Sequence, residues 1–523
     1  MYNTILPSVE NINLAEYRDR VLGCWTGKNI GGTLGEPFEG QRDMNSVTFY
    51  TRELNGVPAP NDDLDLQLVW MLAVEEKGLY RITPQVLGEY WLNCITGPWN
   101  EYGVCKSNMR NGFYPPLSGS VNNERWKFSN GAWIRSEIWA CLFPGSPDEA
   151  VCYAYMDACC DHCGEGIYAE MFTAALQSAA FVVRDIRQLI EIALAKIPPD
   201  CRIARVVRLV CEYYDKGAGI VDTREAIVKD SEDLGFFQAP GNIGFVILGL
   251  LFGEGDFGKS ICLAVNCGDD TDCTAGTVGA TLGIMYGRSH IPVKWVEPIG
   301  ESLKTCSITT YDTNGVLSYP KTVGELTDRI TKLAILARLE NPTLPDISKH
   351  AASVSSGYLE ALKDSAVVRA RLWNRSPYEL LFRLPFVDFA VDYEGGPLME
   401  AGESKKLTLK LFNTPGPETT ARIQFHLPEG WRMSPAPGAV LTVKCVEIMQ
   451  VEVTLTAGEF PDAFVYLPVD VRLCGRLHPT IVHLPVQSRG TAGFTTPVQG
   501  LEFSDDLRRR RSRYAYPLEK LDY

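Results

Sequence analysis

Apolar residues recur every three or four positions along most of the chain from about Asn13 to Ala370. This spacing places them on one face of an α-helix. Two clear examples are the runs Leu64, Leu68, Val69, Leu72 and Met171, Ala174, Ala175, Ala179. The pattern predicts an all-α domain over residues 1–370.

The apolar period changes to two beyond a polar, proline-containing segment at residues 371–385, which we interpret as a linker. Alternation of this kind is typical of half-buried β-strands. It is clearest in three runs: Leu407, Leu409, Leu411; Ile423, Phe425, Leu427; and Val451, Val453, Leu455. We therefore expect a multidomain chain, with an antiparallel, immunoglobulin-like β-sandwich over residues 386–490 and a C-terminal extension or tail over 491–523.

Small residues recur four apart in two of the predicted helices. The two sets are Gly23, Gly27, Gly31 and Ala275, Gly279, Gly283. Residues four apart lie on one face of a helix, and such small side chains leave room for two helices to approach closely.

The composition narrows the classes of function. The chain has 523 residues, 45% of them hydrophobic, and a net charge of −14. A strongly acidic chain argues against a broad nucleic-acid surface, and no apolar run is long enough to span a bilayer. The sixteen scattered cysteines favour free thiols over a disulfide framework. We expect a cytoplasmic protein with neither nucleic-acid nor membrane partners, and find no sequence indication of its oligomeric state.

Two acidic clusters stand at predicted helix starts, Asn61-Asp62-Asp63 and Asp270-Thr271-Asp272. Either cluster alone could simply cap its helix. Both, however, carry more acids than a cap uses, and adjacent carboxylates are costly to bury without a cation. If they converge, the oxygen-rich set favours Mg²⁺ or Mn²⁺ over zinc. An EF-hand is excluded, because the first cluster lacks the glycine and the glutamate of the calcium loop.

Several motifs resemble the ADP-ribosylglycohydrolase family in order and spacing. They are Gly31-Gly32-Thr33-Leu34-Gly35-Glu36-Pro37-Phe38-Glu39, the first acidic cluster, Ser129-Asn130-Gly131-Ala132-Trp133-Ile134-Arg135, His162 and Gly268-Asp269-Asp270-Thr271-Asp272. The resemblance covers most of the helical part. It implies an all-α fold with a two-magnesium centre that hydrolyses the bond between ADP-ribose and a protein side chain or small acceptor.

The resemblance also assigns metal ligands. It implies that Asp62, Asp63, Asp270 and Asp272 bind metal, with Asp62 and Asp272 counted among the catalytic residues. Asn61 and Cys273 stand where the family usually has threonine ligands, and Leu64 replaces another threonine of the first motif. A thiol is a soft ligand that prefers zinc or copper to magnesium. We therefore expect one of the metal positions to be weaker or altered.

Glu39 matches the glutamate that lies beside the scissile bond in the family, although Gly32 replaces that motif's aspartate. We expect Glu39 to position or deprotonate the attacking water. The remaining matches imply substrate-binding residues, because glycine in such loops lets backbone N–H groups approach phosphate and ribose oxygens. These residues are Asn130, Gly131, Arg135, His162 and Gly268. For His162, a satisfied, partly buried role is the alternative.

Two further patterns are rejected. Residues 253–260 match the P-loop pattern, but Glu254 and Asp256 place carboxylates where phosphates would lie. Cys159, Cys160, His162 and Cys163 could suggest zinc, yet neighbouring positions on a helix do not all face one ion. Ordinary packing is favoured there.

The predicted function is metal-assisted hydrolysis of a C1 ribosyl bond, with an ADP-ribosylated protein or small-molecule ADP-ribosyl compound as substrate. Two alternatives stay open. The same centre could cleave another glycoside or nucleoside, since the metal chemistry recognises a vicinal diol. Alternatively, because Asn61, Leu64 and Cys273 depart from the family pattern, the protein could bind ADP-ribose without turnover.

Overall fold

The computed structural model describes residues 11–309, 318–353, 355–413, 417–435, 437–444 and 447–491. The predicted tail at 491–523 lies outside the described residues apart from Thr491. Contacts divide the chain into two units. One combines Met1–Ile95 with Tyr114–Glu379 and is helical; the other combines Thr96–Phe113 with Leu380–Tyr523 and holds two β-sheets.

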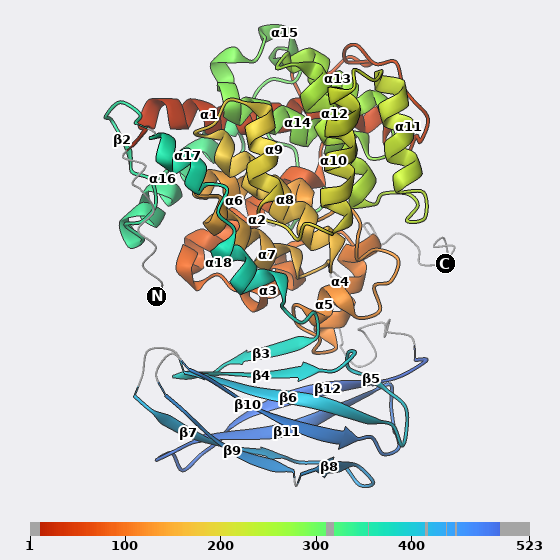
Figure 1. Ribbon diagram of the computed structural model, residues 1–523, viewed down its shortest axis with the longest axis vertical. Coiled ribbons are helices and arrows are strands. Elements are labelled where there is room, and N and C mark those ends of the chain that lie inside the picture. Colours follow the sequence, from red (N-terminus) through yellow and green to blue (C-terminus); the bar gives the residue numbers. More distant parts are fainter. Residues whose placement is uncertain are drawn as a thin grey trace, which may run out of the picture. The chain divides into compact units, whose positions relative to one another are not determined.

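The helical unit confirms the helical period read from the sequence (Figure 1). A small parallel pair joins β1 (Ile12–Asn13) to β2 (Ile347–Ser348), which an all-α prediction did not include. The helices are α1 (Leu14–Gly35), α2 (Asp62–Lys77), α3 (Pro84–Cys94), α5 (Leu117–Ser120), α6 (Glu137–Leu142), α7 (Pro147–Ala158), α8 (Glu165–Ala180), α9 (Ile186–Leu194), α10 (Arg202–Asp215), α11 (Ile220–Asp230), α12 (Ala239–Gly253), α13 (Phe257–Asn266), α14 (Thr271–Tyr286), α15 (Val293–Val296), α16 (Val323–Glu340), α17 (Ser356–Ala361) and α18 (Ala366–Val368).

Helices α1 and α14 touch backbone to backbone along the two stripes of small residues. A Cβ built on Gly27 would stand 2.1 Å from the carbonyl oxygen of Gly279, so no larger residue fits there. At the other end of this contact, a Cβ on Gly35 would lie 2.3 Å from the carbonyl oxygen of Thr271. The close approach therefore fixes the first turn of α14 beside the last turn of α1.

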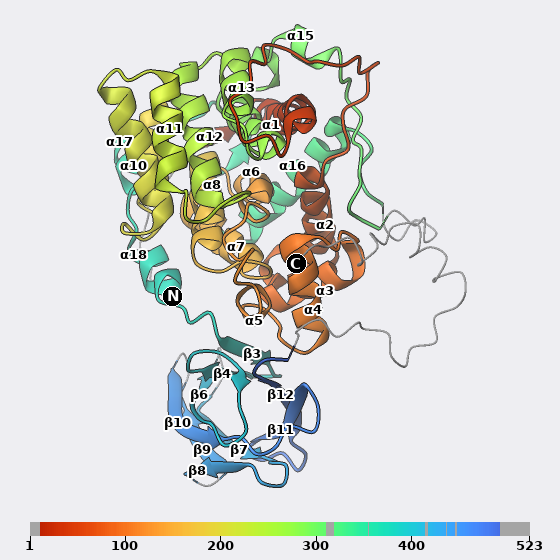
Figure 2. The ribbon, with the colours of Figure 1, turned by 90° about the vertical axis from the view of Figure 1, so that its right-hand side faces the viewer.

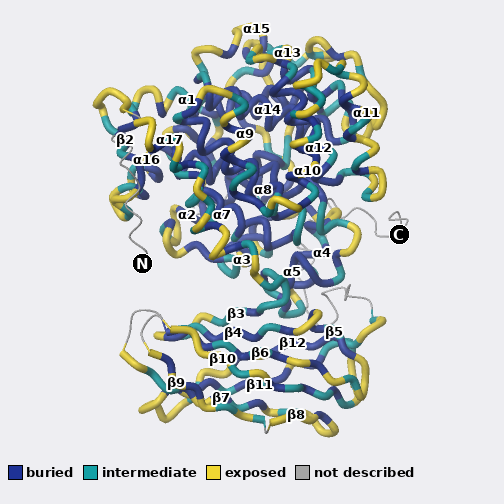
Figure 3. Tube along the Cα trace, viewed as in Figure 1, coloured by how far each residue is buried: buried dark blue, intermediate teal, exposed yellow. Residues whose placement is uncertain are grey.

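The interior of the unit lies around α8 and α14, whose traces are almost wholly buried (Figure 3). Polar side chains on these helices are consequently far from water and need partners within the protein. Among the helices that the structure describes, none combines the length and apolar character required to cross a membrane.

The second unit contains two five-stranded sheets that face each other (Figure 2). Strand β6 pairs antiparallel with β4 and β10, and β11 pairs antiparallel with β7 and β12, whereas β5 pairs parallel with β12. The side chains of Leu407, Leu409 and Leu411 are buried on one face, as the alternation predicted. The strand orders are β3 (Glu379–Arg383), β4 (Val387–Tyr393), β6 (Ser404–Asn413), β10 (Ile448–Thr456), β8 (Arg432–Ser434); and β5 (Leu398–Met399), β12 (Thr480–Ser488), β11 (Phe464–Leu473), β7 (Thr419–Phe425), β9 (Gly438–Val443).

The two structural units differ from the domain boundaries predicted from the sequence in two places. Strand β3 begins at Glu379, inside the segment interpreted as a linker, because its short apolar run shows no clear alternation. Helix α4 (Asn100–Arg110) belongs to the second unit rather than to the helical one. The Phe113 ring that follows α4 lies 5.6 Å from the ring of Phe464 on β11, which explains this grouping.

Candidate metal centre

Two loops that are distant in sequence are joined by their backbones. Gly40 donates its N–H to the carbonyl of Asp269 at 3.0 Å, and Asp269 donates to the carbonyl of Gln41 at 2.7 Å. Gly268 has a φ of +80°, and a Cβ there would meet the carbonyl oxygens of Gln41 and Asp43 at 2.6 Å. Glycine at 268 is therefore a requirement of this junction.

The start of α2 reaches the same place. Asn61 caps the helix, its Oδ1 accepting from the N–H of Asp63 at 2.7 Å. The amide nitrogen of Asn61 donates to Asp272 Oδ2 at 3.2 Å. The two acidic clusters therefore converge, as the sequence predicted. Asn61 presents its amide N–H₂ group to Asp272, because its carbonyl oxygen already accepts the hydrogen bond that caps α2.

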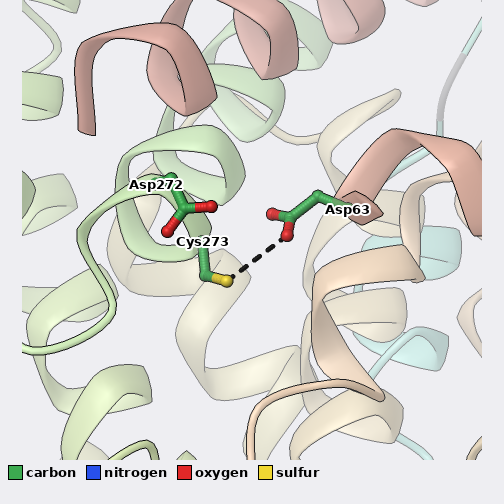
Figure 4. A group of neighbouring side chains, drawn as sticks. All are labelled: Asp63, Asp272 and Cys273. Carbon is green, nitrogen blue, oxygen red and sulfur yellow. Dashed lines mark hydrogen bonds between the residues drawn. The ribbon is translucent and has the colours of Figure 1, made fainter. Parts of the chain in front are cut away.

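Five of the converging side chains form two groups that could each hold a cation. Asp63, Asp272 and Cys273 offer ligand atoms within 4.8 Å of one another, and so do Glu39, Asp270 and Asp272. The groups share Asp272. Figure 4 shows the first group, in which the Cys273 thiol donates to Asp63 Oδ1 at 3.3 Å. Asp62 lies outside both groups of described residues.

The electrostatics of this site favour the binding of a cation. Burial, followed by the charge of Asp272, raises the pKa of Asp270 well above its ordinary value. Burial also raises the pKa of Asp272, and the neighbouring Asp62 adds to it. Partial desolvation and the charge of Asp272 raise the pKa of Glu39 to about 8. Carboxylates assembled in this way lower their free energy by binding a cation.

Buried oxygen atoms without partners support the same interpretation. Among the described residues, Asp270 Oδ1 and Asp272 Oδ1 have no hydrogen-bond partner, although the two residues are only 5% and 6% exposed. A buried carboxylate oxygen without a partner carries a large desolvation cost. The all-oxygen group of Asp270, Asp272 and Glu39 thus suits a hard divalent cation.

A buried lysine that the sequence reasoning missed lies beside the first group. Lys28 Nζ is 3.1 Å from Asp63 Oδ2 and 3.2 Å from Glu137 Oε1. Burial by itself lowers the pKa of Lys28, but the carboxylates of Glu137 and Asp63 reverse this effect and raise it above its ordinary value. The ammonium therefore stays charged. The available signal was that Lys28 is the one cation in the stretch of small, apolar and uncharged polar residues from Val21 to Gly35 of α1.

Asn130, predicted to contact substrate, holds one of the candidate ligands. Its amide nitrogen donates to Asp270 Oδ2 at 2.7 Å, and its Oδ1 accepts from the indole N–H of Trp133 at 3.0 Å. The carbonyl of Gly131, next in the chain, accepts from the guanidinium of Arg135. The loop at residues 129–135 is thereby tied both to the acidic site and to the interior.

The side chains of His162 and of Arg135, the last residue of this loop, are completely buried. The guanidinium of Arg135 contacts Asp157 at 2.8 Å and Asp161 at 2.7 Å. His162 lies 2.9 Å from Asp161 through Nδ1 and 3.1 Å from the Ser129 hydroxyl through Nε2. These contacts hold both side chains in the interior, although His162 Nδ1 has no hydrogen bond among the described residues, and their role as substrate contacts stays a prediction.

The rejected motifs take ordinary structural roles. Residues 253–260 comprise the last residue of α12, the turn at 254–256 and the first turn of α13, which Asp256 caps by accepting from the N–H of Lys259 at 2.7 Å. The described cysteines are free thiols. Neither ligand group among the described residues includes Cys159, Cys160 or Cys163.

A model of one protein family, ADP-ribosylglycohydrolase, matches residues 13–336 of the chain. The chain belongs to the ADP-ribosylglycohydrolase family. The resemblance drawn from the sequence motifs is thereby confirmed. The matched residues include both acidic clusters and the loop at 129–135.

Two individual proteins show local likeness to the chain. It is 43% identical over 44 residues to the ADP-ribosylarginine hydrolase Tri1 of Serratia proteamaculans (strain 568), a match that covers 8% of this chain and 12% of that protein. The cupredoxin domain of amoB from Nitrosocaldus yellowstonii matches with 10% identity and a TM-score of 0.16, covering 23% of this chain and 97% of that one. A TM-score of this size establishes no shared fold.

Proposed function

We propose that this ADP-ribosylglycohydrolase family member is a metal-dependent hydrolase of the C1 ribosyl bond in ADP-ribosylated substrates. The observation that carries the proposal is the pair of buried, unpartnered oxygens of Asp270 and Asp272, held beside Glu39 in a domain of this family. Such oxygens have a clear chemical use as ligands of a hard cation.

Three acidic residues are the proposed ligands of the cation. Asp270, Asp272 and Glu39 would hold Mg²⁺, or Mn²⁺ in its place, and Asn130 keeps the Asp270 carboxylate in position through its 2.7 Å hydrogen bond. When bound, the cation would lower the pKa of a water and stabilise charge on the ribose. The two-magnesium centre expected from the resemblance remains a prediction.

Glu39 is the group best placed to act on water. It lies on the exposed loop after η1 (Glu36–Phe38), whereas the aspartates are buried. A carboxylate at such a rim can orient a water and accept its proton as the oxocarbenium-like transition state forms. The negative charge of Asp62 also acts on Glu39, because it raises the pKa of the Glu39 carboxyl.

The substrate class follows from the family. Tri1 is by name an ADP-ribosylarginine hydrolase, and we propose an ADP-ribosyl group on arginine or another acceptor as the substrate here. The partner would be an ADP-ribosylated protein or small molecule. Hydrolysis of another glycoside or nucleoside is the competing reaction on this scaffold, since a cation centre of this kind recognises a vicinal diol.

Release of ADP-ribose tests the proposal. ADP-ribosylarginine peptide, ADP-ribosylserine peptide and a plain nucleoside are each incubated with protein and Mg²⁺, and products are measured by liquid chromatography with mass detection. We expect ADP-ribose release that EDTA removes and that Asp270→Asn or Asp272→Asn reduces at least a hundredfold, because a metal ligand is lost. Asp222→Asn, an exposed acid at the start of α11, is the matched control and leaves the rate unchanged.

Two results would contradict the proposal. Cleavage of the nucleoside alone would favour the competing glycosidase reaction. Calorimetric binding of ADP-ribose without any turnover would instead identify a binding protein.

A further inference from the structure

Both oxygens of Asp63 lie against groups of the protein, Oδ1 in a hydrogen bond and Oδ2 in an ion pair without a hydrogen bond to any described residue. Oδ2 lies 3.1 Å from the ammonium of Lys28, and Oδ1 accepts from the thiol of Cys273 at 3.3 Å. Asp63 is 1% exposed and Lys28 is 2% exposed, so water does not screen this pair. The carboxylate is thus neutralised by a fixed charge of the chain.

The ammonium of Lys28 is held in place from several sides. It donates to the carbonyl of Ile134 at 2.6 Å and lies 3.2 Å from Glu137 and 3.4 Å from the hydroxyl of Thr277. These three groups accept the three protons of the ammonium, and Asp63 is its ion-pair partner. Lys28 therefore has no reason to move away when a cation approaches Asp63.

Glu137, the second carboxylate beside Lys28, is also held by hydrogen bonds within the protein. It accepts from Gln67 at 2.9 Å and from Gln177 at 3.2 Å. Because Glu137 is completely buried and fully bonded, it cannot turn toward the acidic site to provide another ligand. The local arrangement is a closed polar network beneath Asp63.

The group of Asp63, Asp272 and Cys273 is consequently a poor site for a hard cation. An ion bound to Asp63 at about 2.1 Å would stand within about 5 Å of the Lys28 ammonium, where like charges repel strongly in a buried site. The third ligand is a thiol, which magnesium binds weakly. The group of Glu39, Asp270 and Asp272, by contrast, offers only oxygen ligands.

Asn61 also makes the group of Asp63, Asp272 and Cys273 a poor site for a hard cation. Its carbonyl oxygen is used by the helix cap, and it presents a donor to Asp272. An amide N–H₂ group cannot ligate a cation. Neither Asn61 nor Cys273 therefore supplies a hard ligand.

We propose that Lys28 serves as a built-in second cation, so that the centre binds one hard divalent ion, on Glu39, Asp270 and Asp272, instead of two. This inference rests on the proposed function only in assuming that the centre binds metal. It makes Lys28 a positioning residue, which holds Asp63 and its charge without touching the substrate.

The number of bound ions tests the inference directly. The full chain is titrated with Mn²⁺, and free Mn²⁺ is followed by electron paramagnetic resonance, with equilibrium dialysis against Mg²⁺ as an independent measurement. We expect one ion per wild-type chain. Two ions would overturn the role of Lys28, whereas none would overturn the metal centre itself, and the two failures are therefore distinguishable.

Variants distinguish the effect of the Lys28 charge on the number of bound ions from the effect of the Cys273 thiol. Cys273→Thr keeps one ion because Lys28 is still present, whereas Lys28→Met combined with Cys273→Thr gains a second. Lys259→Met, which removes an exposed lysine paired with Glu254 at 2.9 Å, is the matched control and keeps one ion. A folded double variant that still binds one ion, with circular dichroism equal to wild type, would contradict the proposal. The wild-type count decides the question even if the double variant does not fold.

Discussion

At the scale of single residues, the helical unit depends on buried charges that are matched internally. Asp161 illustrates this: burial alone would raise its pKa, but Arg135 and His162 lower it below the ordinary value. Glu170, in the same cluster, shows the opposite result, because burial and the charge of Asp157 raise its pKa well above the ordinary value. The charge state of each acid is thus set by its neighbours.

Arg135→Met tests this dependence. Removal of the guanidinium leaves Asp157 and Asp161 buried without their cation, which typically costs about 3–5 kcal/mol in the free energy of unfolding. Urea denaturation measures the change. Arg18→Met is the matched control, because Arg18 pairs with Asp328 at 2.7 Å on the surface, where such pairs contribute about 0–1 kcal/mol. Equal losses for both variants would show that the buried network is not what stabilises the unit.

At the scale of secondary-structure elements, the contact between α1 and α14 positions the site. The end of α1 leads into the loop with Glu39, while α14 begins at Thr271 next to the aspartates. Because backbone meets backbone at Gly27, Gly31 and Gly279, the distance between these helix ends is set by glycine and not by adaptable side chains. A change in this contact moves the ligands.

Gly27→Ala is expected to destabilise the protein by about 1–3 kcal/mol or more, because the added methyl overlaps the backbone of α14. It is also expected to weaken Mn²⁺ binding, since the first turn of α14 shifts. Gly357→Ala is the control: it lies in helix α17 with open space around its Cβ position, and helix propensity predicts a neutral or slightly stabilising effect. Thermal melting and Mn²⁺ titration measure both effects, and unchanged binding in a destabilised Gly27 variant would contradict the link.

At the scale of the whole molecule, the candidate site belongs entirely to the helical unit. Each of its ligands comes from the segments that the family model matches, residues 13–336. A cation bound there stabilises the native state of that unit.

Mg²⁺ at about a hundred times its dissociation constant is therefore expected to add about 2.7 kcal/mol to the free energy of unfolding of the helical unit. Differential scanning calorimetry with Mg²⁺ and with EDTA measures the shift. Asp272→Asn removes the ligand shared by both groups and should abolish the shift. An equal shift in that variant would mean that the stabilising ion binds elsewhere.

The sequence by itself determined the helical and strand periods, the close approach of two glycine-bearing helices and the acidic residues at two helix starts. These features are local: each depends on the spacing of residue types along a few turns or strands. The motifs also indicated the family. They placed Asp270 and Asp272 among the candidate metal ligands and Glu39 among the catalytic residues before any contact was known; that Glu39 shares a ligand group with the two aspartates came from the structure.

Only the tertiary structure decided which side chains share a ligand group, that Lys28 pairs with Asp63, and that the segment Thr96–Phe113 joins the sheets. Arg135 and His162 matched the motif as candidate substrate contacts, yet they are buried. The physical reason is that ion pairs and ring contacts form between residues far apart in the chain. Tertiary packing determines which residues form these contacts, and the spacing of residue types along a single helix or strand does not indicate them.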